Sequence, residues 1–228
     1  MSPFDLIEWP CPTPDGERHD ELALVFDRGR ERRLLVLPAW FDEANKLRRQ
    51  TVEIMRRLDI AGIDSMLPDL PGCNESEMAL AVQTLESWRA AADAAARHFR
   101  ASHVLTIRTG ALLAPRDLPG WTYAPVDGKR MLRSMLRARM IASREAGRTE
   151  RSEDLQALAR EHGIELGGWQ LGAELFRELE ETALSHGLTE IDQGALGGSG
   201  LWLRAEPDEA PEQADALAAL VTIGISSP

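Results

Sequence analysis

The sequence of 228 residues has little of several residue types, and each scarcity excludes a class of protein. Its only cysteines, Cys11 and Cys73, are too few and too far apart for a disulfide framework or a metal-ligand motif. No apolar run approaches the roughly 20 residues of a membrane-spanning helix. The N-terminus has neither the basic start nor the apolar stretch of a signal peptide. These absences predict a cytoplasmic protein without a metal, a cofactor or a membrane span.

Positive charge is also scarce. The chain has 26 Lys and Arg against 37 Asp and Glu, and its formal net charge of −11 argues against nucleic-acid binding. Lysine occurs only as Lys46 and Lys129, so nearly all of the basic residues are arginines. They are unevenly placed, because residues 128–144 hold six basic residues and no acidic one, whereas residues 206–215 are acidic.

The apolar pattern of the first half predicts strands that alternate with helices. Apolar runs at 22–26 and 34–37 flank a polar turn at Gly29 and predict a β-hairpin. Further along, the pattern predicts a helix, a short strand, a long helix, and two more strands at 45–62, 63–72, 78–99, 103–107 and 121–126. Alternation of this kind predicts an α/β fold, with a mostly parallel twisted sheet flanked by helices.

Helical patterns dominate the second half. They predict a helical insertion, resembling a cap, at about residues 129–187 of a single domain that spans 1–228. After it, GLWLRAEP (200–207) predicts a returning strand.

The segment HVLTIRTGALL (103–113) reads as a strand that turns into a helix. In many hydrolases such a turn carries the nucleophile in the pattern Gly-x-Ser-x-Gly. Here the five residues are Thr106-Ile107-Arg108-Thr109-Gly110, so Arg108 takes the place of the serine and only Gly110 fits. Arginine stays protonated and cannot act as a nucleophile. Arg108 therefore either belongs to an ordinary turn or forms an anion clamp at the sheet edge.

A catalytic triad also needs a histidine after the last strand. None of the five histidines follows GLWLRAEP: they are His19, His98, His103, His162 and His186. Cys73 and Ser76, in the loop LPGCNES, are alternative nucleophiles, but no histidine is placed to activate them. The simpler interpretation is that Asn74 or Ser76 caps a helix that starts near residue 77, and that Asp69 shapes the turn.

The segment DEANKLRR (42–49) is the most informative polar run. It places Lys46, Arg48 and Arg49 in the first turn of a predicted helix, where cations oppose the helix dipole. One interpretation is an ion-pair network with Asp42 and Glu43 that fixes the loop. The other is a site for phosphate or carboxylate, built from helix-start N–H groups and the side chains of Asn45, Lys46, Arg48, Arg49 and Arg108.

A second basic group, Arg130, Arg133 and Arg137, has the spacing i, i+3, i+7, which predicts one stripe along a helix. The stripe is either a solvated face or a surface that binds an acidic partner.

The chain resembles a known group in two segments, LPAWFDEANKLRRQ and LPDLPGCNES. The group is the second type of exosortase A system-associated hydrolases, which are α/β-hydrolase-type proteins. RTGALLA, APVDGKRMLRSMLRARM and GGWQLGAEL are similar to later segments of it. The matching residues are Glu43, Asn45, Lys46, Arg48 and Arg49, then Leu67, Pro68, Asp69, Leu70, Gly72, Cys73 and Ser76.

The resemblance implies an α/β-hydrolase-like fold and an association with exopolysaccharide production and exosortase sorting. It also implies a protein partner, the other hydrolase-like protein of the same system. The group itself tends to lack the serine at the elbow, so its name does not establish activity. Two hypotheses follow. One is a catalytically degenerate protein that binds a partner or a small anionic, acyl or sugar ligand. The other is an active ester or thioester hydrolase with a non-standard nucleophile.

Overall fold

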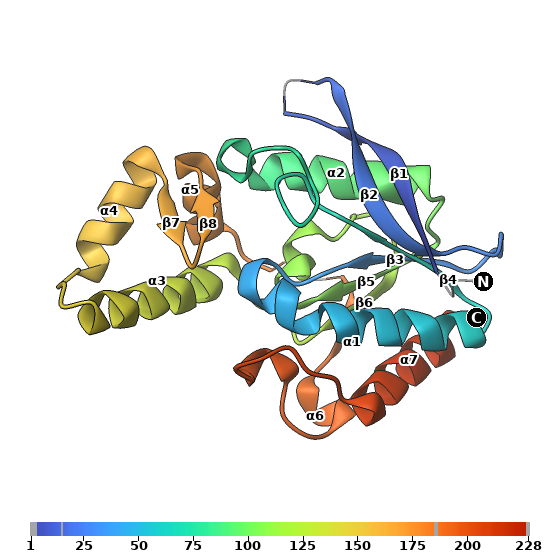
Figure 1. Cartoon of the computed structure of the whole chain (residues 1–228). Helices are drawn as coiled ribbons and strands as arrows, with labels where there is room; N and C mark the ends of the chain where they lie inside the picture. Colours follow the sequence, from blue (N-terminus) through green and yellow to red (C-terminus); the bar gives the residue numbers. More distant parts are fainter. Residues whose placement is uncertain (1–3, 15, 185–186, 227–228) are drawn as a thin grey trace.

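A seven-stranded sheet forms the centre of the molecule. The computed structural model describes residues 4–14, 16–184 and 187–226. The strand order is β1-β2-β4-β3-β5-β6-β9, and Figure 1 shows helices on both faces of the sheet. The strands are β1 (Asp5–Pro12), β2 (Arg18–Phe26), β3 (Arg33–Leu37), β4 (Asp64–Pro68), β5 (His103–Ile107), β6 (Gly120–Tyr123) and β9 (Thr189–Ile191).

Most of the sheet is parallel. Strands β4, β3, β5, β6 and β9 are parallel to one another, and β1 and β2 add an antiparallel ribbon at one edge. The helices α1 (Phe41–Ile60) and α7 (Pro211–Ser226) cover one face, and α2 (Leu85–His98) covers the other. The predicted fold class, a mostly parallel sheet between layers of helices, is confirmed.

Strand β3 shows why these residues form a central strand. All five residues of RLLVL are buried. Leu34 and Val36 belong to the apolar cluster beneath α1 and α7, whereas Leu35 and Leu37 belong to the cluster beneath α2. Burying each leucine stabilises the fold by about 1.5–3 kcal/mol, so a continuous apolar run is favoured where helices cover both faces.

The predicted hairpin of residues 22–26 and 34–37 is wrong. Strand β2 pairs with β1 and with β4, both antiparallel, while β3 lies between β4 and β5 as a parallel strand. The polar segment between the two runs therefore connects strands that lie on either side of β4, and it does not close a hairpin. The true hairpin partner, β1, has the pattern DLIEWPCP, whose two prolines obscure its strand character.

Two predicted helix starts are also wrong. Helix α1 begins at Phe41, so Asp42 and Glu43 occupy its first turn and the three cations lie further along. Helix α2 begins at Leu85, where Thr84 and Ser87 form a capping box. The stretch before α2 contains only the short 3₁₀ turn η1 (Leu80–Val82).

The predicted strand at 200–207 is absent as well. Those residues form the 3₁₀ turn η3 (Leu201–Leu203), and β9 is the last strand in chain order. The short helix α6 (Gln193–Leu196) follows β9. Among the described residues, no helix is both long enough and apolar enough to pass through a membrane.

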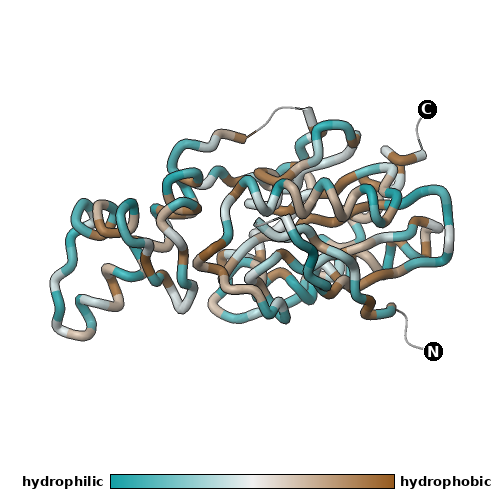
Figure 2. The backbone as a smooth tube through the Cα atoms, turned by 90° about the horizontal axis from the view of Figure 1, so that it is seen from above, coloured by the Kyte–Doolittle hydropathy of each residue, from teal (hydrophilic) through white to brown (hydrophobic). Residues whose placement is uncertain are grey.

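Between β6 and β9 the chain forms a separate group of elements, called the α3–α5 segment here (residues 128–181). It lies beside the sheet at the left of Figure 1 and extends the molecule at one end in Figure 2. Within this largely helical segment, residues 164–166 and 169–171 pair as a small antiparallel β-hairpin. The elements are α3 (Gly128–Glu145), α4 (Ser152–His162), β7 (Ile164–Leu166), β8 (Trp169–Leu171) and α5 (Ala173–Glu181).

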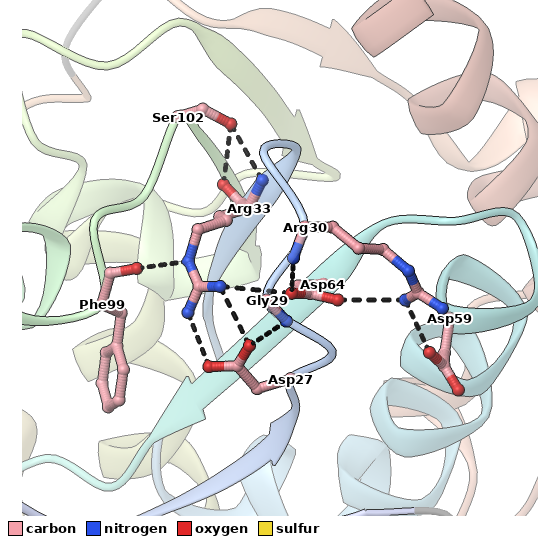
Figure 3. A network of polar contacts seen from close by, with 8 residues as sticks. All are labelled: Asp27, Gly29, Arg30, Arg33, Asp59, Asp64, Phe99 and Ser102. Carbon is pink, nitrogen blue, oxygen red and sulfur yellow. Dashed lines mark hydrogen bonds and ion pairs between the residues drawn. The ribbon is translucent and has the colours of Figure 1, made fainter.

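A buried ion-pair network surrounds Arg33 at the N-terminal end of β3, as Figure 3 shows. The guanidinium of Arg33 donates to both carboxylate oxygens of Asp27, at 2.9 and 2.7 Å, to Asp64 at 3.2 Å and to the carbonyl of Phe99 at 2.7 Å. Asp64 is fully buried and also accepts the backbone N–H of Arg30. The hydrogen bonds from Arg33 hold the pKa of Asp27 well below its ordinary value.

We expect Arg33→Met to lower the free energy of unfolding by about 1–3 kcal/mol, because Asp27 loses its guanidinium partner and the buried Asp64 keeps only that of Arg30. The pKa of Asp27 is lower in the folded state than its ordinary 3.8. Its contribution to stability is therefore present above that pH and lost below it. Arg33→Met should remove this part of the acid sensitivity. Urea unfolding between pH 2 and pH 7 measures both effects, with the exposed neighbour Arg32→Met as control. Equal stabilities of the two variants would contradict the expectation.

Candidate functional site

The turn after β5 has a strained backbone. Arg108 adopts a φ of 56°, in the left-handed region that costs a non-glycine residue about 1–3 kcal/mol. Two residues later, a Cβ added to Gly110 would lie only 2.3 Å from the carbonyl oxygen of Leu37. Gly110 therefore allows the turn to pack directly against the end of β3. Thr106, at the other end of the five-residue pattern, is fully buried and donates to the hydroxyl of Thr122.

The side chain of Arg108 is fixed from several sides. Its Nε and Nη2 donate to the two carboxylate oxygens of Glu43 at 2.9 and 3.0 Å, and its Nη1 donates to the carbonyl of Ala124 at 2.8 Å. The guanidinium carbon lies 3.9 Å from the ring centroid of Trp202. Only 11% of the side chain is exposed. A bidentate ion pair and a cation–π contact thus hold the charge where α1, β6 and η3 meet.

The neighbouring residue of the turn is engaged too. The backbone N–H of Trp40, at the end of the loop from β3 to α1, donates to the hydroxyl of Thr109 at 3.0 Å. This hydrogen bond ties the loop after β3 to the turn after β5.

Solved structures provide the comparison. No family model and no curated protein matches the chain. A protein of Agrobacterium vitis S4 named as a candidate hydrolase has a TM-score of 0.54 at 15% identity, covering 98% of this chain and all of its own. The α/β hydrolase GrgF of Penicillium sp. sh18 gives 0.50 at 15% identity, covering 79% of this chain and 73% of its own. This chain has the α/β-hydrolase fold. At this level of identity, the likeness extends to the fold alone.

In active α/β hydrolases, the catalytic histidine follows the last strand. In this α/β-hydrolase fold, the segment after β9 brings Trp202 against Arg108 and, edge-on, against Tyr123, with ring centroids 5.8 Å apart. Burial raises the pKa of Tyr123 to about 12. Trp202 was not among the site residues predicted from the sequence, because the apolar residues around it resemble a strand.

Of the five histidines, His186 lies outside the described residues.

The cations of residues 42–49 do not converge. Lys46 pairs with Asp42 at 2.7 Å, as the ion-pair interpretation expects. The other two pair elsewhere, Arg48 with Asp69 at 3.0 Å and Arg49 with Glu209 at 2.8 Å, and Asn45 is exposed. Each predicted anion-binding cation thus contacts a different carboxylate, including Arg108 with Glu43. Binding of an anion by these residues stays a prediction.

The loop of Cys73 and Ser76 is held by its own hydrogen bonds. Ser76 does not cap α2: its hydroxyl donates to Glu21 at 2.7 Å and accepts the N–H of Gly72 at 2.9 Å. Asn74 does not cap it either, since its side chain donates to Asp69 at 2.6 Å. Burial, followed by the charge of Asp69, raises the pKa of the Cys73 thiol to about 12.

A cavity of about 570 Å³ is lined by residues of α1, of the turn after β5, of η3 and of the α3–α5 segment. This volume is in the range of small-molecule sites, about 300–1,000 Å³. Four aromatic side chains and two methionines form most of the apolar part of the lining, and Thr109 and Glu43 lie near the turn. The six charged lining residues are three cations and three anions, so the lining carries no net formal charge. They are Lys46, Arg139 and Arg148 against Asp42, Glu43 and Glu165.

Sequence reasoning did not find most of this lining. The residues from the α3–α5 segment and η3 include Met131, Met135, Trp169 and Trp202. At helical spacing, the methionines are typical of an ordinary core face. Among the described residues, no group of three His, Cys, Asp or Glu side chains is arranged to hold a metal ion.

We expect neither cysteine of the folded protein to react with iodoacetamide at pH 8. The thiolate is the reactive form, and both Cys11 and Cys73 have a pKa raised to about 12, chiefly by burial. The thiolate fraction is then only about one in ten thousand. Mass spectrometry after a short exposure measures the label, with the protein in urea as the positive control. Rapid labelling of Cys73 alone in the folded state would revive the cysteine-nucleophile hypothesis.

Proposed function

We propose that this α/β-hydrolase-fold protein has lost hydrolytic activity and serves as a binding protein. The observation that carries the proposal is Arg108, at the centre of the strained turn after β5, with Glu43, Ala124 and Trp202 fixing its side chain. A nucleophile at this position must lose a proton or attack as a neutral group, and a guanidinium paired with a carboxylate does neither.

Among the residues that line the cavity, no other side chain is arranged for the role. Thr109 accepts a hydrogen bond from Trp40, and Ser143 donates to Glu150. Ser134 also lines the cavity, but none of the lining residues is a histidine that could activate it. The alternative of an active hydrolase with an unusual nucleophile therefore has no activated hydroxyl in its favour within the cavity.

The cavity is the proposed binding site, with the α3–α5 segment as its cap within one domain. Its aromatic and methionine lining favours a ligand with an apolar body, such as an acyl chain, because methionine adapts to flexible apolar shapes. The balanced charges of the lining favour a polar head group without a large net charge. The resemblance to the exosortase-associated group supports a role beside exopolysaccharide production, with the second hydrolase-like protein of that system as a partner.

We expect no turnover of p-nitrophenyl esters or acyl thioesters above the uncatalysed rate, and no labelling by a fluorophosphonate probe. Arg108→Ser should remain inactive, because it supplies a hydroxyl but no histidine to activate it. A serine esterase assayed beside it shows that the substrates and the probe work. Stoichiometric labelling of one wild-type serine would overturn the proposal.

We expect decanol and decanoate to raise the melting temperature of the wild type, since both place an apolar chain in the cavity. Ala138→Phe should abolish this rise by filling the lining of the cavity. Ala157→Phe, at an exposed position of α4 that is not part of the lining, should preserve it. Differential scanning fluorimetry measures the melting temperatures.

Phosphate and sulfate provide the contrasting probes. If these anions alone raise the melting temperature, and Arg48→Ala or Arg49→Ala removes the rise, the site is the predicted anion site and the acyl proposal fails. If all four compounds leave the wild type unchanged, both ligand classes are excluded.

A further inference from the structure

Helix α3 presents three different faces along its length. Leu132, Leu136 and Ser143 are buried against the rest of the α3–α5 segment. A second face lines the cavity, and a third points to solvent. At 100° per residue, the cations of the solvent face fall within one stripe about 100° wide. We call it the basic stripe; it consists of Lys129, Arg130, Arg133, Arg137 and Arg144, all of them exposed.

The basic stripe has no ion-pair partner in the part of the chain that the structure describes. Among the described residues, no carboxylate lies within salt-bridge distance of its five cations. Arg139, which lies on another face of the same helix, is instead paired with Glu150 at 2.8 Å. Five unpaired cations on one helix are unusual in a chain with a net charge of −11, whose other arginines are mostly ion-paired.

A second copy of this chain is a poor occupant. Three of the five carboxylates in residues 206–215, which are the natural complement of the stripe, are already paired with arginines of the same chain, and this leaves only Glu206 and Glu212 for a partner copy. Asp208 pairs with Arg204, Glu209 with Arg49 and Asp215 with Arg57.

We propose that the basic stripe docks the protein on the surface of a bilayer that contains anionic lipids. The stripe spans 16 residues, about 22 Å along one side of the helix, so a flat charged surface can reach all five cations at once. Ile141 borders the stripe and is 51% exposed, an apolar side chain that suits the interface between head groups and acyl chains.

The cavity lies on the other side of the same helix. Met131 and Met135 line the cavity from α3, so a docked bilayer lies about one helix diameter, roughly 10 Å, from an apolar cavity. This places the cavity near the source of acyl-bearing molecules. The docking proposal goes beyond the ligand-binding role and does not require it, because its test makes no use of the cavity.

The test is co-sedimentation with vesicles of phosphatidylcholine containing 30% phosphatidylglycerol, at about 50 mM salt. We expect the wild type to bind these vesicles and not pure phosphatidylcholine, with binding lost at high salt. Each cation near such a surface contributes about fivefold in partitioning. The triple variant Arg130→Gln, Arg133→Gln, Arg137→Gln should therefore bind about 100-fold more weakly.

The matched control removes the same charge elsewhere, with Arg18→Gln, Arg97→Gln and Arg116→Gln at exposed positions outside the stripe. It should bind like the wild type, and equal melting temperatures show that both variants fold. Absence of wild-type binding, or equal weakening of the two variants, overturns the proposal. Binding to poly-L-glutamate without binding to vesicles also overturns it, and assigns the stripe to an acidic protein partner instead.

Discussion

The ion pair between Arg108 and Glu43 holds together the segments that meet at the carboxyl ends of the parallel strands. A guanidinium on a strained turn, only 11% exposed, is costly unless its charge and its N–H groups are satisfied. Glu43 comes from the first turn of α1, the accepting carbonyl from the end of β6, and Trp202 from the segment after β9. Three parts of the chain thus converge on one side chain of the turn after β5. The same contacts fix the residue that the sequence pattern assigns to the elbow position, which is why the proposed loss of activity rests on them.

Helix α3 links the two proposed binding roles through its geometry. A helix has room for three faces, and here one is buried, one lines the cavity, and one carries unpaired cations. The buried face fixes the orientation of the other two, because Leu132 and Leu136 determine which way the helix is rotated. The packing of the buried face therefore fixes the direction of the basic stripe and that of the cavity face together, although the two surfaces have no residue in common.

Sequence reasoning succeeded where local pattern and burial agree. The strand HVLTI and the run RLLVL are buried on both faces, so their apolar pattern leaves little choice of structure. It failed where the structure of a segment depends on contacts with residues far away in the sequence. Residues 22–26 pair with β1 and β4, which their own pattern does not reveal. Residues 201–203 form a 3₁₀ turn despite a strand-like pattern, because Trp202 packs on Arg108 and Tyr123.

The α/β class, the arginine within the elbow pattern and the stripe on α3 can all be predicted from residue identity at a fixed spacing, because helical or strand geometry turns spacing into position. The carboxylate that each cation contacts cannot be predicted in this way. Arg48, Arg49 and Arg108 pair with Asp69, Glu209 and Glu43, at separations of 21, 160 and 65 residues. Side chains so far apart in sequence meet only through the packing of the whole sheet and its helices, so no local pattern encodes their partners.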